Sequence, residues 1–259
     1  MTPRTRAARG QRRPGRSLPP RQERLTVGGP ATPPGGTWYP PCKAALERVA
    51  ALALLVLTGP LVLALAGLVR LTSRGPAFYS QTRLGRDGLP FTIYKLRTMV
   101  NRCESLTGPR WSLPGDPRVT PLGRFLRASH LDELPQLVNV LRGEMSLIGP
   151  RPERPEFLPE LEAACPGYRQ RLAVRPGVTG LAQVQLPADT SVDSVRLKLA
   201  YDLYYIRHVG PRLDLALLVC TALYALGLPF AVAARLLRVP HGEEVEGEAR
   251  AAEDARCAA

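Results

Sequence analysis

The chain has 259 residues, of which 45% are hydrophobic, and 35 lysines and arginines against 22 acidic residues give it a formal net charge of +13. This length suits one domain of catalytic size, and a mean hydropathy of -0.08 excludes both a fully disordered chain and a polytopic membrane bundle. The five cysteines include no Cys-x-x-Cys pair, so neither a zinc site nor a disulfide framework is indicated, and a reducing compartment is favoured.

The first 42 residues are rich in arginine, proline and glycine. Residues 1–24 alone hold eight arginines against one glutamate. Because they show almost no apolar periodicity, they can bury too little surface to offset the entropy of ordering the chain. We therefore expect a disordered arm over residues 1–42, whose positive charge suits either an anionic membrane leaflet or simple solubility.

Residues 43–72 contain a long apolar segment. Val49 to Val69 carries no charge, and a straight helix of that length would be about 32 Å long, enough to cross a hydrocarbon core of about 30 Å. Gly59-Pro60 lies in its middle, and because proline has no N–H we expect a break or sharp kink there. Basic residues flank both ends, which favours a re-entrant hairpin over a straight span.

Residues 73–212 show a mixed pattern and are expected to form the catalytic domain. Short strands are predicted at Phe78–Gln81 and Phe91–Lys95, on either side of the turn signal Asp87-Gly88. Apolar spacing predicts one helix over Leu131–Arg142. The expected fold class is α+β, mainly helical, with a small domain seated on the helix-break-helix membrane hairpin.

The C-terminal part divides into an apolar and an acidic stretch. Leu215 to Ala234 carries no charge but is interrupted by Gly227 and Pro229. Over 213–240 we expect helices that are buried against the domain or lie in the membrane interface, with a true span as the less favoured alternative. Residues 241–259 are acidic and alanine-rich, and a disordered, solvated tail is expected.

Two adjacent carboxylates, Asp132 and Glu133, stand out in the catalytic domain. In isolation they suit helix capping, since Ser129 three residues earlier gives a capping-box spacing. The surroundings favour another interpretation, because a diphosphate site needs guanidinium groups for the oxygens and carboxylates for a metal or for attack on phosphorus. Basic residues in the same domain that could serve this purpose include Lys95, Arg97, Arg127, Arg151 and Arg175.

Five motifs occur in order along the chain. They are KLRTM at 95–99, LDELPQL at 131–137, NVLRGEMS at 139–146, GPRPE at 149–153 and RPGVTG at 175–180. From about residue 43 to about residue 227 the sequence resembles the bacterial sugar transferase family, the monotopic polyprenyl-phosphate phosphoglycosyl transferases. The resemblance implies an enzyme that uses Mg²⁺ and moves a sugar-1-phosphate from a UDP-sugar to polyprenyl phosphate, releasing UMP through a covalent intermediate.

The same resemblance implies roles for the carboxylates and for the basic residues near them. Asp132 corresponds to the nucleophile, and Glu133 assists it, with the metal or as a base; both are expected beside Mg²⁺. Arg127 and Arg151 correspond to phosphate-binding residues. Two further expected phosphate or lipid-headgroup ligands are Lys95 and Arg97, which follow a predicted strand.

A loop and a helix break complete the implied site. The loop containing Arg175, Pro176, Gly177 and Thr179 is expected to border the substrate pocket, and Gly59-Pro60 corresponds to the break of the re-entrant helix. The implied location is the inner bacterial membrane, with the catalytic domain facing the cytoplasm. The implied role is to start the synthesis of exopolysaccharide or a related glycan. Membrane lipid is an expected partner, and a homodimer is possible.

Several positions leave alternatives open. Residues 185–189 depart from the Asn-Gly-Arg segment of many relatives near the donor pocket, which leaves the sugar undefined. His130 is interpreted as a neutral substitution, with a proton shuttle as the alternative. We expect a helix to pack through its tyrosines Tyr201, Tyr204 and Tyr205. Whether Asp202 on the same helix faces the site is left open. A nucleic-acid-binding protein and an inactive membrane scaffold are the alternative functions, and no nucleic-acid partner is expected.

Overall fold

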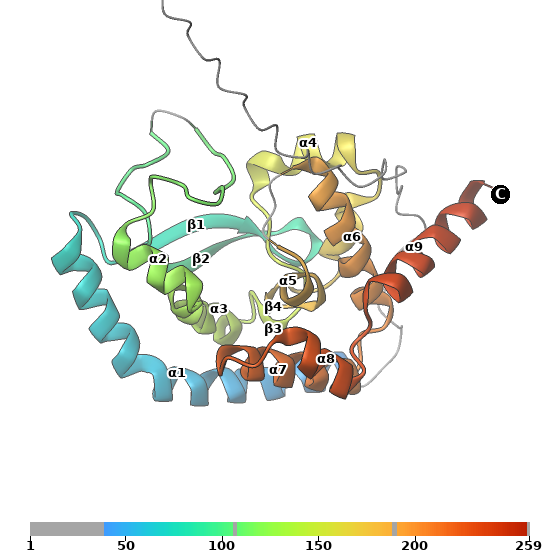
Figure 1. The fold of residues 1–259 in the computed structure, drawn as a ribbon, viewed down its shortest axis with the longest axis horizontal. Helices are drawn as coiled ribbons and strands as arrows, with labels where there is room; N and C mark the ends of the chain where they lie inside the picture. The colour runs from blue at the N-terminus through green and yellow to red at the C-terminus, as the bar shows by residue number, and fades with distance from the viewer. Residues whose placement is uncertain (1–38, 106–107, 188–190, 258–259) are drawn as a thin grey trace, which may run out of the picture.

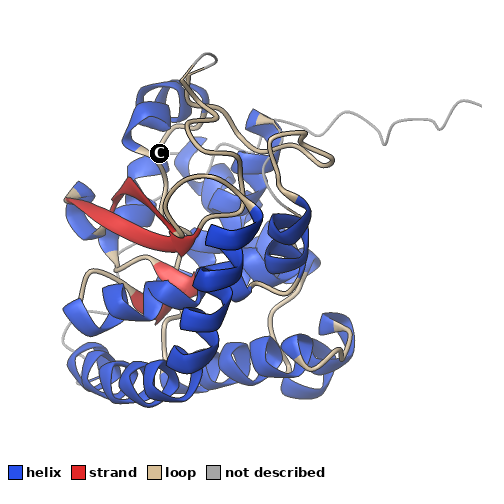
Figure 2. Ribbon diagram, turned by 90° about the vertical axis from the view of Figure 1, so that its left-hand side faces the viewer, coloured by secondary structure: helices blue, strands red, loops and turns tan. Residues whose placement is uncertain are grey.

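The computed structural model describes residues 39–105, 108–187 and 191–257. Within them, helices dominate and two small sheets lie at the centre (Figures 1 and 2), which confirms the predicted mainly helical α+β class. The predicted disordered arm lies outside the described residues except for its last four. Those four, from Tyr39 to Cys42, form the first turn of a helix, so that helix begins earlier than predicted.

Helix α1 runs from Tyr39 to Thr72 and is assigned as one helix through Pro60. Figure 1 shows that it changes direction near its middle: the first half lies along the base of the molecule and the second half rises from it. The expected interruption at Gly59-Pro60 therefore takes the form of a bend and not of a break. Within the described residues, α1 alone is long and apolar enough to cross a membrane.

The two predicted strands are confirmed and are longer than expected. β1 (Phe78–Leu84) pairs antiparallel with β2 (Pro90–Leu96), and the short helix η1 (Arg86–Gly88) forms the turn between them. Asp87 adopts a left-handed conformation in that turn, with φ of 59°. Sequence periodicity gave no sign of the second, parallel pair, β3 (Ser146–Ile148) with β4 (Gly177–Thr179), because each strand has only three residues.

The predicted helix over Leu131–Arg142 is wrong in its first half. The structure has a 3₁₀ helix, η2, at Leu131–Gln136, followed by a short α-helix, α3, at Leu137–Arg142. Pro135 explains the change, because a proline in a helix interior has no N–H to donate and its ring clashes with the preceding turn. The apolar spacing correctly identified the segment as helical, but it did not define the type of helix.

The remaining elements enclose the central sheets and form two hydrophobic clusters. Helix α6 is the central element of the larger cluster, with buried residues along most of its length. The smaller cluster joins the second half of α1 to β2 and α2 through Val69, Leu96 and Leu126. Besides η2 and α3, the described helices between β2 and residue 207 are α2 (Pro121–Ala128), η3 (Pro155–Phe157), α4 (Leu158–Ala164), η4 (Tyr168–Ala173), α5 (Leu181–Gln185) and α6 (Val192–Arg207).

The C-terminal apolar stretch forms two helices, α7 (Pro211–Ala225) and α8 (Phe230–Leu237). They contact each other and lie beside α1 at the base of the molecule (Figure 1). Gly227 makes the turn possible because its φ is 92°, a region that side-chain-bearing residues rarely adopt. The stretch is therefore a pair of short helices and not one span.

The acidic tail was predicted to be disordered, and this prediction is wrong. Gly242–Cys257 forms helix α9, which packs on α6 and buries Val245 and Ala249, four residues apart on one helical face. Tyr204 donates a hydrogen bond to Glu244 at 2.6 Å, and Arg207 pairs with Glu248 at 2.7 Å. The glutamates therefore pair with α6, and the small apolar residues between them supply the buried stripe.

Candidate active site

The carboxylate pair lies at the start of η2, directly after α2. His130 precedes it in a left-handed conformation, with φ of 57°, and turns the chain between the two helices. The hydroxyl of Ser129 donates to the carbonyls of Phe125 and Leu126 at the end of α2. The capping-box interpretation of Asp132 is therefore wrong, because Ser129 bonds to the preceding helix.

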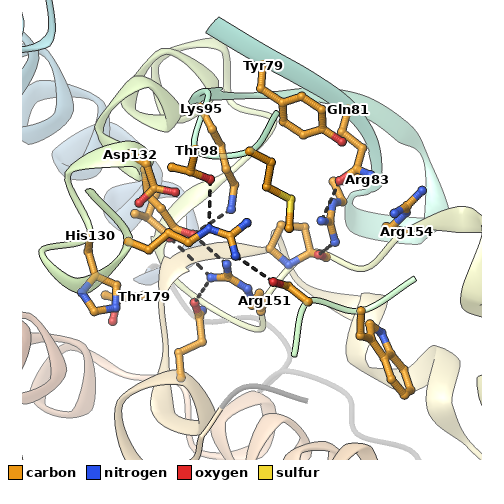
Figure 3. Close-up of a pocket in the computed structure, with 18 of the residues that line it drawn as sticks. Tyr79, Gln81, Arg83, Lys95, Thr98, His130, Asp132, Arg151, Arg154 and Thr179 are labelled. Carbon is orange, nitrogen blue, oxygen red and sulfur yellow. Dashed lines mark hydrogen bonds and ion pairs between the residues drawn. The ribbon is translucent and has the colours of Figure 1, made fainter. Parts of the chain in front are cut away.

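Both carboxylates line a large cavity of about 1570 Å³. Figure 3 shows Asp132, Lys95 and Arg151 around one part of this cavity, and Arg83 and Arg154 in another. The walls come from β1, β2, η2, the loop after β3, and the turn between α7 and α8. Seven of the predicted site residues line this cavity although they are far apart in the sequence: Lys95, Arg97, Arg127, Asp132, Glu133, Arg151 and Thr179.

Glu133 is held between two cations. Lys95 Nζ lies 2.7 Å and Arg151 Nη2 lies 2.6 Å from the same oxygen, Oε1 of Glu133. Arg151 also donates to Gln183 Oε1 at 3.0 Å, which fixes its fork. Burial would raise the pKa of Glu133, but the positive charges of Arg151 and Lys95 outweigh it and hold that pKa well below its usual range.

Asp132 has the opposite environment. Its side chain is buried, and no hydrogen bond or ion pair to its carboxylate oxygens is found in the described part of the chain. Burial, and then the negative charge of Glu133, raise the pKa of Asp132 to about 6. A carboxylate that is ionised near neutral pH and carries no partner of its own is suited to attack an electrophile.

Arg127 reaches the same cavity from α2. Its guanidinium donates to Thr98 Oγ1 at 2.9 Å and to Ser112 Oγ at 2.8 Å. Among the described residues it has no carboxylate partner, so hydroxyl groups hold it in place without neutralising its charge. This arrangement suits a phosphate oxygen, because guanidinium groups bind such oxygens through charge-assisted hydrogen bonds.

Arg97 differs from the prediction. It is only 5% exposed, and its guanidinium donates to the carbonyl of Ser73 at 2.9 Å and to the carbonyl of Arg74. These carbonyls lie just beyond the end of α1. Although Arg97 borders the cavity, its hydrogen bonds anchor the end of α1 to β2, which differs from the expected phosphate or headgroup contact.

The predicted substrate loop is divided between two places. Thr179 lines the large cavity, whereas Arg175 lines a separate, smaller one at the start of α1. Gly177 N donates to Pro150 O at 2.8 Å, and a Cβ at this position would lie 2.1 Å from Gly149 N. Glycine is therefore required for β4 to approach the turn that carries Arg151, and Pro176 O accepts from Ser146 N at 2.8 Å in the same pairing.

Sequence reasoning missed the support behind Arg151. Arg171 donates to the backbone carbonyl of Arg151 at 2.8 Å, to Tyr168 Oη at 2.7 Å and to Asp202 Oδ2 at 2.7 Å. Asp202 is 3% exposed, lines the same large cavity as the carboxylates, and forms this ion pair with Arg171 through Oδ2. Nothing in the spacing of Arg171 and Asp202 indicated this contact, since they come from η4 and α6.

The carboxylates fit part of a magnesium site. Mg²⁺ in proteins is commonly bound by one or two carboxylates together with substrate phosphates. No group of three or more His, Cys, Asp or Glu side chains is found in the described residues that could hold a metal. Because Lys95 and Arg151 already bond to Glu133, Asp132 is the freer ligand. The donor set therefore fits an ion shared with a bound diphosphate.

Paired carboxylates among fixed cations, beside a long apolar helix, are typical of a membrane-associated enzyme that acts on phosphorylated substrates. Comparison with known proteins agrees. Residues 38–227 match the family described as bacterial sugar transferase, and the chain belongs to that family.

Three relatives illustrate the similarity. The chain is 48% identical over 167 residues to a UDP-glucose:undecaprenyl-phosphate glucose-1-phosphate transferase of Caulobacter vibrioides, covering 64% of this chain and 62% of the relative. It is 40% identical over 179 residues to a UDP-N-acetylgalactosamine-undecaprenyl-phosphate N-acetylgalactosaminephosphotransferase of Aeromonas hydrophila, covering 69% and 42%. It is 36% identical over 185 residues to the exopolysaccharide production protein PSS of Rhizobium leguminosarum bv. phaseoli, covering 69% and 92%. The chain thus spans less than two thirds of the first two relatives.

Proposed function

We propose that this protein transfers a sugar-1-phosphate from a UDP-sugar to polyprenyl phosphate and releases UMP. One observation carries the proposal. Asp132 is buried without a hydrogen-bond or ion-pair partner among the described residues, and two cations hold the adjacent Glu133 ionised. The named activities of the relatives supply the substrate classes. The similarity to an exopolysaccharide production protein supports a place at the start of glycan assembly.

The proposed chemistry has two displacements at one phosphorus. A carboxylate oxygen of Asp132 attacks the sugar-bearing phosphorus, the bond to the UMP oxygen breaks, and UMP leaves with the bonding electrons. An oxygen of polyprenyl phosphate then attacks the same phosphorus, and the bond to Asp132 breaks to restore the carboxylate. Arg127 and Arg151 neutralise charge on the phosphate oxygens, and Mg²⁺, held by Asp132 and Glu133, would supply further charge neutralisation.

The proposed seating in the membrane explains how the two substrates meet. The exposed apolar residues of α1 include Leu46, Val49, Leu57 and Leu63. With its bend, α1 suits a re-entrant hairpin in the inner membrane, with the catalytic domain on the cytoplasmic face. A lipid acceptor and a water-soluble donor then both reach Asp132.

Labelling of single-cysteine variants tests this topology. One variant keeps only the native Cys42, and the other carries only Arg74→Cys, so that the two thiols mark the two ends of α1. For a re-entrant helix we expect a membrane-impermeant reagent to label both thiols from the cytoplasmic side alone. Labelling of the two positions from opposite sides would show that α1 spans the membrane.

The decisive test of function is a UMP-release assay with the purified full chain, Mg²⁺ and a panel of UDP-sugars. Multiple turnovers are expected only when polyprenyl phosphate is present, and donor alone should release at most one UMP per enzyme. Mass spectrometry of that mixture should find the phosphosugar on Asp132. Turnover with donor alone, or a product without the phosphate of the donor, would contradict the proposal.

The pKa of Asp132 predicts how the first displacement depends on pH. The attacking group must be ionised, and its pKa is about 6. We therefore expect kcat/KM for the donor to be constant above pH 7 and to fall about tenfold per unit below pH 6. Single-turnover UMP release from donor alone is the right measurement, because the acceptor phosphate does not take part. The pKa of Glu133 lies well below this range, so a flat profile down to pH 5 would exclude Asp132 as the titrating group.

A further inference from the structure

A second cavity lies at the start of α1, apart from the carboxylates. Its volume is about 120 Å³, and its walls come from the first turns of α1, η1, β3 and the segment before β4. The charged residues that line it are Lys43, Glu47, Arg86 and Arg175. This volume accommodates a phosphate group but not a nucleotide sugar.

The negative charge in this cavity is already neutralised. Glu47 accepts hydrogen bonds from Ser146 Oγ at 2.6 and 2.8 Å and pairs with Lys43 at 3.0 Å. Lys43 in turn lies 2.5 Å from Asp214, which also accepts from Tyr205 Oη at 2.7 Å. This network joins α1 to α7 and leaves no acidic group of the cavity unpaired among the described residues.

The arginines are not neutralised to the same extent. Arg175 is partly buried, and no hydrogen bond or ion pair of its guanidinium is found within the described ranges. Burial lowers the pKa of Arg175, and the positive charges of Arg86 and Arg48 lower it further. Among the residues that the structure describes, Arg86 pairs with its neighbour Asp87 alone, at 3.1 Å, and both side chains are more than half exposed, so this pair contributes little.

Arg48, which follows Glu47 on α1, is not among the residues that line this cavity. One of its guanidinium nitrogens lies 2.6 Å from the position that a Cβ would take at Gly143, so Arg48 lies across the end of α3. The two guanidinium groups that line the cavity, those of Arg86 and Arg175, therefore lie beside a floor whose charges are neutralised. A phosphate group between them would be attracted to both.

We propose that this cavity binds a phosphate group through Arg86 and Arg175. Arginine forks are well matched to phosphate oxygens, whereas the hydroxyl groups of Ser146 and Tyr205 in the same wall already donate to Glu47 and Asp214. On α1, the apolar residues Leu46 and Val49 lie within one turn of Glu47, and they are 68% and 69% exposed. If α1 is seated in the membrane as proposed above, the cavity lies at headgroup level. The phosphate then comes from an anionic phospholipid, and the alternative source is free phosphate.

Thermal unfolding of the detergent-solubilised full chain tests this site, because a ligand that binds only the folded state raises the unfolding midpoint. The probes are short-chain phosphatidylglycerol, short-chain phosphatidylcholine and inorganic phosphate. We expect phosphatidylglycerol to raise the midpoint of the wild type and phosphatidylcholine to do so much less. Arg86→Gln should weaken the apparent affinity by about tenfold, and Arg86→Gln with Arg175→Gln by more.

Arg212→Gln is the matched control, since Arg212 is an exposed arginine at the start of α7 and makes the same change of charge. It should leave the affinity for phosphatidylglycerol unaltered, and so should Asp132→Asn, which separates this site from the transfer reaction. A midpoint shift by inorganic phosphate that the Arg86 variant also weakens would identify free phosphate as the ligand. An equal shift in the double variant, or no shift of the wild type by either anion, would overturn the proposal.

Discussion

Asp132→Asn is expected to lower sugar-phosphate transfer by about 10⁴-fold or more, since loss of a covalent nucleophile typically has effects of this size. Asparagine fills nearly the same space but cannot supply the attacking carboxylate oxygen. The phosphosugar adduct should also disappear when enzyme and donor are mixed alone. The measurement is UMP release with saturating donor and polyprenyl phosphate, and a loss of less than tenfold would remove Asp132 from the nucleophile role.

The stability of the same variant provides the control. The pKa of Asp132 is raised from its usual value to about 6, so the folded state disfavours the ionised form. The linkage follows from that direction: the ionised side chain costs stability as pH rises from about 4 through 6, and the cost is fully present above pH 6. Asparagine removes this charge, so the variant should melt no lower than the wild type at pH 8. A large drop in its midpoint would mean that lost activity reflects unfolding.

Arg171→Leu is expected to destabilise the fold by about 3–5 kcal/mol, the usual cost of removing one partner of a buried ion pair. Arg171 and Asp202 lie 2.7 Å apart, with side chains 8% and 4% exposed. The substitution leaves the Asp202 carboxylate without its guanidinium in a buried place. It also removes the hydrogen bond to the backbone of Arg151, so KM for the donor should rise in whatever fraction remains folded.

Arg169→Leu is the matched control for Arg171, two residues away in η4. Arg169 pairs with Glu162 on the surface, where its side chain is 67% exposed. Its loss should cost little stability, because exposed ion pairs are screened by water and contribute little. Chemical unfolding monitored by far-UV circular dichroism compares the two variants. Equal losses in the free energy of unfolding from Arg169→Leu and Arg171→Leu would show that the buried pair contributes no more to stability than the surface pair.

The buried pair also explains how a distant contact supports the site. Arg171 holds the carbonyl of Arg151, Arg151 holds Glu133, and Glu133 raises the pKa of its neighbour Asp132. The cations around Glu133 and the free oxygen of Asp132 therefore depend on the packing of η4 against α6. A conservative Arg171→Lys variant should recover part of the stability but not the bidentate contact.

Local chemistry along the chain was sufficient to predict several features. The hairpin of β1 and β2 follows from alternating apolar residues around Asp87-Gly88, and a bend in α1 follows from Pro60, because turn and proline geometry depend on only a few neighbouring residues. The carboxylate pair was found for the same reason, since its two members are adjacent. Long apolar runs likewise identified α1 and the α7–α8 pair by composition alone.

Other features were decided only by the tertiary structure. The sequence placed Arg97 and Arg175 with the carboxylates because they lie in neighbouring motifs. Packing leaves Arg97 at the border of their cavity but commits its guanidinium to the end of α1, and it directs Arg175 to another cavity. The acidic tail folds because α6 offers it a partner surface. Whether a charged side chain binds substrate, caps a helix or supports a neighbour depends on residues dozens of positions away, which local sequence patterns do not specify.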